Sequence, residues 1–174
     1  MFSYRLRFSL ILLFIIIGLV LQVKLGFSSA WYLYLAALLL LFTHFRFGNV
    51  SAAFVKLRQG HPEHAEILLD QIKRPDWLAK RHRAYYHFTR GMIATQEEDL
   101  QEGEVELNKA LELGLRSATD HALVALNLAH ICFVGQRKEE ARKYLDLAKS
   151  HPTNDLLIKE KVKELEQALI TSQN

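Results

Sequence analysis

The sequence predicts an all-α fold with an N-terminal transmembrane helical hairpin, about three further helix pairs and a C-terminal capping helix. Two long apolar runs occupy most of residues 1–50, and no alternating strand pattern of useful length is present. Small or apolar residues also recur every 38 residues between positions 53 and 148. A fixed period of this kind is typical of stacked helical hairpins. The positions in register are Ala53, Gly91 and Ala129; Ala65, Gly103 and Ala141; Leu69, Leu107 and Leu145; and Ile72, Ala110 and Ala148.

Residues 1–47 are predicted to form a membrane anchor with two transmembrane helices, at about 8–25 and 29–46. A helix of about 16 apolar residues rises about 24 Å, which is less than the ~30 Å of a bilayer's hydrocarbon core, so flanking residues must extend each span. Trp31 and Tyr32 suit an interfacial aromatic belt. A cleaved signal peptide is the alternative, but the first run is long for one and a second apolar run follows at once.

The distribution of charge predicts the orientation of this anchor. Residues 1–50 contain four Lys/Arg and no Asp or Glu, whereas residues 51–174 contain 18 Lys/Arg and 19 Asp/Glu. The positive-inside rule therefore puts both termini and the repeat domain in the cytoplasm, and we expect an integral protein of a bacterial inner (plasma) membrane. Because the basic excess belongs to the membrane-flanking part, nucleic acid is not a predicted partner.

The rest of the chain predicts three helical hairpins over residues 50–152, at about 50–75, 76–114 and 117–152. Glycine and proline residues are expected to end their helices, and Asp76 and either Ser117 or Thr119 are expected to begin two others as N-caps. A capping helix follows over residues 154–170, with Asn154-Asp155 at its start, and residues 171–174 are a tail. The residues expected to end helices or pairs are Gly60, Pro75, Gly114 and Pro152.

The third hairpin has small residues in its first helix and at the start of its second, then Leu145, Ala148 and Pro152 at fixed spacing. This pattern resembles the tetratricopeptide repeat (TPR) family, whose hairpins stack into an α-solenoid. The period of 38 differs from the family's usual ~34 residues, and Lys56 and Arg90 occupy positions that are usually apolar. The resemblance covers about residues 50–152.

The resemblance implies a scaffold that binds an extended peptide or a partner helix in a concave groove lined by the first helix of each pair. The basic and amide residues with which one subtype of the family binds a terminal carboxylate are missing, so an apolar or amphipathic segment is the expected ligand. The alternative is that these side chains belong to the core between helices. The groove positions in this register are Phe54, Tyr85, Phe88, Met92, Leu126, His130 and Phe133.

Two clusters of charge lie in or near the second hairpin. The basic cluster is expected to contact lipid headgroups or an acidic partner, to pair with the acidic cluster, or to be solvated. The basic cluster comprises Lys73, Arg74, Lys80, Arg81, His82 and Arg83, and the acidic one Glu97, Glu98, Asp99, Glu102, Glu104 and Glu106.

No catalytic or metal-binding pattern stands out. Cys132 is the only cysteine, and the spacing of His61, His64 and Glu66 is not a strong zinc pattern. No catalytic residue, metal, cofactor or small-molecule substrate is therefore predicted. The leading hypothesis is a membrane-anchored scaffold or adaptor that mediates protein–protein interaction or membrane-complex assembly. The alternatives are a structural subunit whose transmembrane hairpin makes the main contacts and, more remotely, a membrane-bound enzyme with a histidine-containing site.

Overall fold

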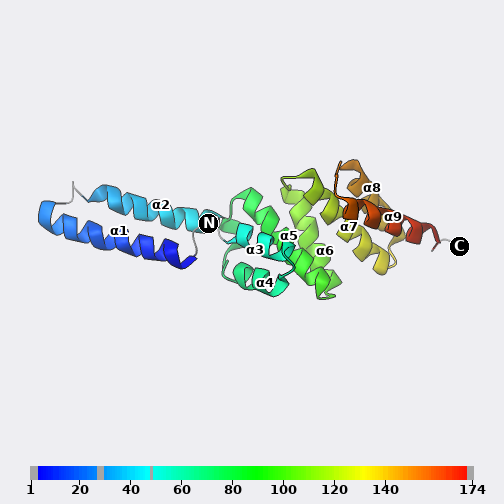
Figure 1. Cartoon of the computed structure of the whole chain (residues 1–174), viewed down its shortest axis with the longest axis horizontal. Coiled ribbons are helices and arrows are strands. Elements are labelled where there is room, and N and C mark those ends of the chain that lie inside the picture. Colours follow the sequence, from blue (N-terminus) through cyan, green and yellow to red (C-terminus); the bar gives the residue numbers. More distant parts are fainter. Residues whose placement is uncertain (1–3, 27–29, 48, 172–174) are drawn as a thin grey trace.

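The computed structural model describes residues 4–26, 30–47 and 49–171, which form nine α-helices and no strand. The all-α prediction is confirmed. Part of the link expected between the two apolar runs and the tail beyond residue 171 lie outside the described residues. Figure 1 shows an elongated molecule, with two helices at one end and the other helices stacked behind them. The helices are α1 Tyr4–Leu25, α2 Trp31–Phe47, α3 Val50–Arg58, α4 Pro62–Asp70, α5 Lys80–Gln96, α6 Leu100–Leu113, α7 Ala118–Val134, α8 Lys138–Ser150 and α9 Leu156–Thr171.

Helices α1 and α2 form the N-terminal hairpin and lie side by side (Figure 1). The Tyr34 ring packs on Gly18, where an added Cβ would lie 3.0 Å from Tyr34 Cε1. The Tyr34 hydroxyl also donates a hydrogen bond to Gln22 Oε1 at 2.7 Å. Of the helices formed by described residues, none is both long enough and apolar enough to span a bilayer.

The remaining helices pack in chain order. Helices α3 and α4, α5 and α6, and α7 and α8 form three pairs, and each later pair contacts the one before it through its first helix. Helix α9 packs on both α7 and α8 and closes the far end of the stack (Figure 1). This order follows from the short links between the helices, because short connections keep consecutive helices adjacent.

The positions related by the 38-residue period form the core of these pairs. Ala65 and Leu107 are fully buried, and Leu145 is 3% exposed. Helices α5 and α6 approach each other closely, because Gly91 leaves room for Leu107. A Cβ added to Gly91 would lie 2.8 Å from Leu107 Cγ, and one added to Gly103 would lie 2.7 Å from Thr95 Oγ1. Small residues at this period therefore allow the two helices to come together.

Three of the predicted helix boundaries are confirmed. Ser117 Oγ accepts a hydrogen bond from Asp120 N at 3.0 Å, and Asp155 Oδ1 accepts one from Leu157 N at 3.0 Å, so each side chain caps the helix that follows it. Gly114 ends α6 with φ 86°, in the left-handed region that favours glycine.

The predicted N-cap Asp76 is wrong. Asp76 lies in a 3₁₀ turn, Pro75–Trp77, and α5 begins only at Lys80, without a side-chain cap. The reason is tertiary: Leu78 is extended, with ψ 148°, and is only 2% exposed, because it packs into the core of the first pair. Burial of Leu78 therefore delays the start of the helix beyond the local capping signal.

Candidate binding groove

One face of α7 presents the main candidate binding surface. Leu123, Leu126, Asn127 and His130 lie three or four residues apart, so their side chains share a face of the helix. A second face carries small residues such as Ala129, which is fully buried in the same core cluster as Ala141 and Leu145 of the neighbouring helix α8. The small residues pack α7 against α8, and the larger side chains lie on the other face of α7.

These side chains line a hollow of about 520 Å³ between α5, α7 and α9. A volume of this size falls in the range of ligand pockets. Four of the seven predicted groove residues meet there. The lining residues are Met92 from α5; Leu123, Leu126, Asn127, His130 and Phe133 from α7; and Lys161, Glu164, Leu165 and Ala168 from α9.

The hollow combines an apolar floor with a polar rim. Leu126 is only 8% exposed, whereas His130 is exposed. On the α9 side, Lys161 Nζ lies 2.9 Å from Glu164 Oε2, an ion pair one helical turn apart, and this hydrogen bond raises the pKa of Lys161. Met92 adds a flexible thioether that adapts to the shape of a bound side chain. Such a surface suits an amphipathic helix, with apolar side chains inward and charged ones at the rim.

The contribution of α9 to this hollow is the part that sequence reasoning missed. The amphipathic pattern of the last helix predicts a cap, and Leu165 belongs to its apolar face. The structure places that face over α7, so that Leu165 also forms a wall of the hollow.

The other three predicted groove residues lie in an aromatic cluster between α3 and α5. The ring centroids of Phe54 and Tyr85 are 5.0 Å apart, and those of Phe54 and Phe88 are 5.3 Å apart. Phe88 is 1% exposed, so it is a core residue and not a groove residue. Tyr85 has a further structural role, because its hydroxyl donates to Asp120 Oδ2 at 2.6 Å and joins α5 to α7. Burial, followed by this hydrogen bond, raises the pKa of Tyr85 to about 12.

The predicted basic cluster lies along the link from α4 to α5 and the first turn of α5. Lys73, Arg74, Lys80 and Arg81 are exposed. Arg83 is half-buried and lies 3.8 Å from Asp76. Among the described residues, no ion pair joins the lysines and arginines of this cluster to the acidic cluster, which was one of the three alternatives.

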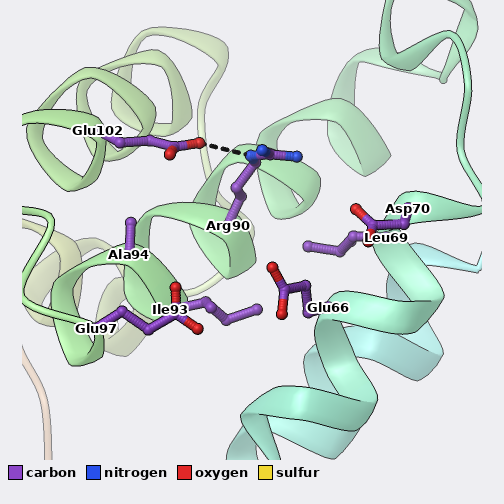
Figure 2. Close-up of a pocket in the computed structure, with 8 residues that line it drawn as sticks. All are labelled: Glu66, Leu69, Asp70, Arg90, Ile93, Ala94, Glu97 and Glu102. Atoms are coloured by element: carbon purple, nitrogen blue, oxygen red, sulfur yellow. Dashed lines mark hydrogen bonds and ion pairs between the residues drawn. The ribbon is translucent and has the colours of Figure 1, made fainter.

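The acidic cluster instead pairs with other cations, and Arg90 is one of them. Figure 2 shows the Arg90 side chain reaching toward Glu102, with Glu66 and Asp70 of α4 around the same small hollow. Arg90 Nε donates to Glu102 Oε1 at 2.8 Å, and this bond raises the pKa of the guanidinium. The hollow holds about 40 Å³, the scale of bound water and not of an organic ligand. Arg90 therefore joins α5 to α6 at a position where the resembled family has an apolar residue.

A second part of the acidic cluster surrounds Glu106, which is 8% exposed. Its two carboxylate oxygens lie 2.7 Å from His87 Nδ1 and 2.7 Å from Lys109 Nζ. Burial raises the pKa of Glu106, but the hydrogen bonds from His87 and Lys109 outweigh it, and the net shift is downward. His87 is thereby engaged in a contact between α5 and α6.

Glu104, Cys132 and Glu140 form the single group of potential metal ligands found among the described residues. Arg137 already provides the positive charge at this place, because its guanidinium donates to Glu104 Oε1 at 2.7 Å and to Glu140 Oε2 at 3.2 Å. Cys132 is fully buried, and burial raises the pKa of its thiol. The arrangement is that of an ion-pair network joining α6 to the start of α8, with the unreactive Cys132 thiol of α7 beside it.

His61 and His64, whose spacing is not a strong zinc pattern, form a ring contact without a third metal ligand among the described residues. The centroids of His61 and His64 lie 5.8 Å apart, at 79° to one another. Two other histidines, His121 and His151, stack with centroids 4.8 Å apart across the third pair. These rings therefore take part in contacts between and within helices.

Comparison with known proteins finds no match for this chain among family models, curated proteins or solved structures.

Proposed function

We propose that this chain is a membrane-anchored, TPR-like scaffold that binds an amphipathic helix of a protein partner in the hollow between α5, α7 and α9. The single observation that supports this best is the hollow itself, with a volume of about 520 Å³ and an apolar floor beneath charged and polar groups. Its size and composition fit a helix that presents apolar side chains at every third or fourth position. The proposal involves binding and no chemical step.

The membrane anchor is the second part of the proposal, in which the α1–α2 hairpin is embedded in a bilayer. Both helices expose large apolar side chains on the faces that do not contact the other helix of the hairpin, whereas a helix at the surface of a globular protein turns a polar face to solvent. A continuous apolar surface of this kind marks contact with a membrane or with another protein. The exposed residues include Leu12, Ile16, Leu19, Val20 and Val23 on α1, and Leu35, Leu38, Leu39 and Phe42 on α2.

The proposed orientation has both termini and the helix pairs in the cytoplasm, at a bacterial inner membrane. It is tested by reporters fused after Asn174. A reporter that is active only in the cytoplasm is expected to work, and one that is active only after export is expected to fail. The opposite result would contradict this orientation.

The binding proposal is tested by filling the hollow. Ala168→Trp adds an indole at its wall, whereas Gln167→Trp adds the same ring at the adjacent exposed position outside it. We expect partner recovery from detergent-solubilised membranes to fall at least tenfold for Ala168→Trp and to stay unchanged for Gln167→Trp. Equal recovery with both variants, with helix content preserved by circular dichroism, would reject binding in the hollow.

The apolar surface of the hairpin supports a second candidate function, a structural subunit held in a membrane complex by α1 and α2. Replacing residues 1–47 with an unrelated membrane hairpin separates the two proposals. Retained partner binding favours the hollow, and loss of binding favours the native hairpin as the contact surface.

A further inference from the structure

We propose that the link between α4 and α5, together with the first turn of α5, is a second membrane-contact site that seats the helix pairs on an anionic bilayer surface. The inference rests on the proposed membrane hairpin and adds to it a lipid class and an orientation of the array. The residues of this seat are Lys73, Arg74, Trp77, Lys80 and Arg81.

The seat lies at the base of the hairpin. Asn49, two residues after the end of α2, donates from its Nδ2 to Oε1 of Gln71 at 2.8 Å. Lys73 follows Gln71 by two residues, and two residues extend at most about 7 Å. The start of the link is therefore held near the point where the chain leaves the hairpin. Figure 1 agrees with this arrangement, because α3 and α4 follow the hairpin directly and α9 lies at the far end.

The seat is strongly positive, because residues 73–83 contain five Lys/Arg and one Asp. Three of these cations, Lys73, Lys80 and Arg81, are exposed and form no ion pair with any residue that the structure describes. Their charge is therefore available to a negatively charged surface. Each basic side chain close to anionic lipid strengthens association about fivefold.

The exposed Trp77 favours a lipid surface over an acidic protein surface as the contact of this site. Its side chain is 51% exposed, and the Arg74 guanidinium carbon lies 4.8 Å from the centroid of its ring. Tryptophan favours the boundary between hydrocarbon and headgroups, where its ring is apolar and its N–H can reach a polar partner. An arginine stacked on that ring brings a guanidinium to the level of the phosphates, which it can bind through two N–H groups.

The two tryptophans of the chain provide the test, because one lies in each proposed contact. In the full-length chain, Trp31→Phe leaves Trp77 as the reporter of the seat, and Trp77→Phe leaves Trp31 as the reporter of the hairpin. Each variant is reconstituted into vesicles with brominated acyl chains, which quench fluorescence at the depth of the hydrocarbon boundary. The vesicles contain phosphatidylcholine alone or phosphatidylcholine with phosphatidylglycerol.

We expect Trp31 to be quenched in both kinds of vesicle, and Trp77 to be quenched several-fold more in the anionic vesicles. In the Trp31→Phe background, neutralising the seat is expected to shift its docking equilibrium about a hundredfold and to remove the quenching of Trp77. The matched control neutralises three exposed lysines on α8 and α9 and is expected to leave the quenching unchanged. The two triple variants are K73Q/K80Q/R81Q and K143Q/K159Q/K163Q.

The two reporters separate failure of the seat from failure of the hairpin. Quenching of Trp31 without quenching of Trp77 would overturn the seat and leave the hairpin proposal intact. Absence of quenching at both positions would overturn both proposals. Quenching of Trp77 to the same extent in both kinds of vesicle would overturn the requirement for anionic lipid.

Discussion

Gly91→Ala provides a sharp test of the packing between α5 and α6. An added Cβ would lie 2.8 Å from Leu107 Cγ, 2.9 Å from its Cδ2 and 3.0 Å from its backbone N. The leucine side chain is fully buried and the backbone N belongs to α6, so the two helices must move apart. Overpacking of this kind costs about 1–3 kcal/mol. Alanine favours a helix over glycine by about 1 kcal/mol, so we expect a net loss of about 0–2 kcal/mol in the free energy of unfolding.

The assay is thermal unfolding followed by far-ultraviolet circular dichroism, with all variants in the same mild detergent. A double-mutant cycle with Leu107→Ala removes two of the three close atoms, so the cost of Gly91→Ala should shrink in that background. If Gly91→Ala instead stabilised the chain by about 1 kcal/mol, as at an open helical position, the close approach of these helices would be refuted.

Three further predictions concern titratable groups in the helix pairs. The net downward shift in the pKa of Glu106 means that its ionised form stabilises the fold. This contribution is present above the unfolded pKa near 4.5 and is lost as the pH falls through the folded pKa. Glu106→Gln should therefore make the free energy of unfolding fall less steeply as the pH is lowered. The pKa of Tyr85 is raised to about 12, so here the neutral phenol is the form that stabilises the fold. This contribution is complete below pH 10 and is lost between about pH 10 and 12, and Tyr85→Phe should remove a step near pH 12 from a tyrosinate absorbance titration. The Cys132 thiol should react with a disulfide reagent only at the rate of unfolding, because it is fully buried and its pKa is raised; fast labelling of the native chain would contradict this placement.

Most helix boundaries could be predicted from the sequence because they depend on local chemistry. Gly114 requires a left-handed backbone, and Ser117 satisfies an N–H of the helix that follows it, so each marks a boundary in any tertiary context. The start of α5 could not be predicted this way. It depends on the burial of Leu78, which is a property of the assembled first pair.

The groove could be predicted only in part, because periodicity identifies a face of a helix but not what covers it. Tyr85, Phe88 and Met92 share one face of α5. Phe54 of the shorter helix α3 covers the first two, and Met92, nearer the end of α5, lines the hollow. The length of the preceding helix therefore decides which of these side chains belong to the core.

The polar contacts between successive helix pairs could not be predicted from the sequence, for a different reason. The Tyr144 hydroxyl donates to Asn108 Oδ1 at 2.8 Å, and Arg137 pairs with Glu104. The partners are 36 and 33 residues apart, close to one repeat period, so they face each other across neighbouring pairs. Hydropathy patterns describe burial and carry no information on which polar side chains reach one another.

Photo-crosslinking from the rim of the hollow tests the central proposal most directly. A photoreactive amino acid replaces exposed His130 at the rim or exposed Asp146 on α8 in the full-length chain. The scaffold proposal predicts a discrete adduct with one protein from position 130, none from position 146, and loss of that adduct when Ala168→Trp fills the hollow. The same adducts from both positions, or an adduct from position 130 that persists with Ala168→Trp, would contradict it.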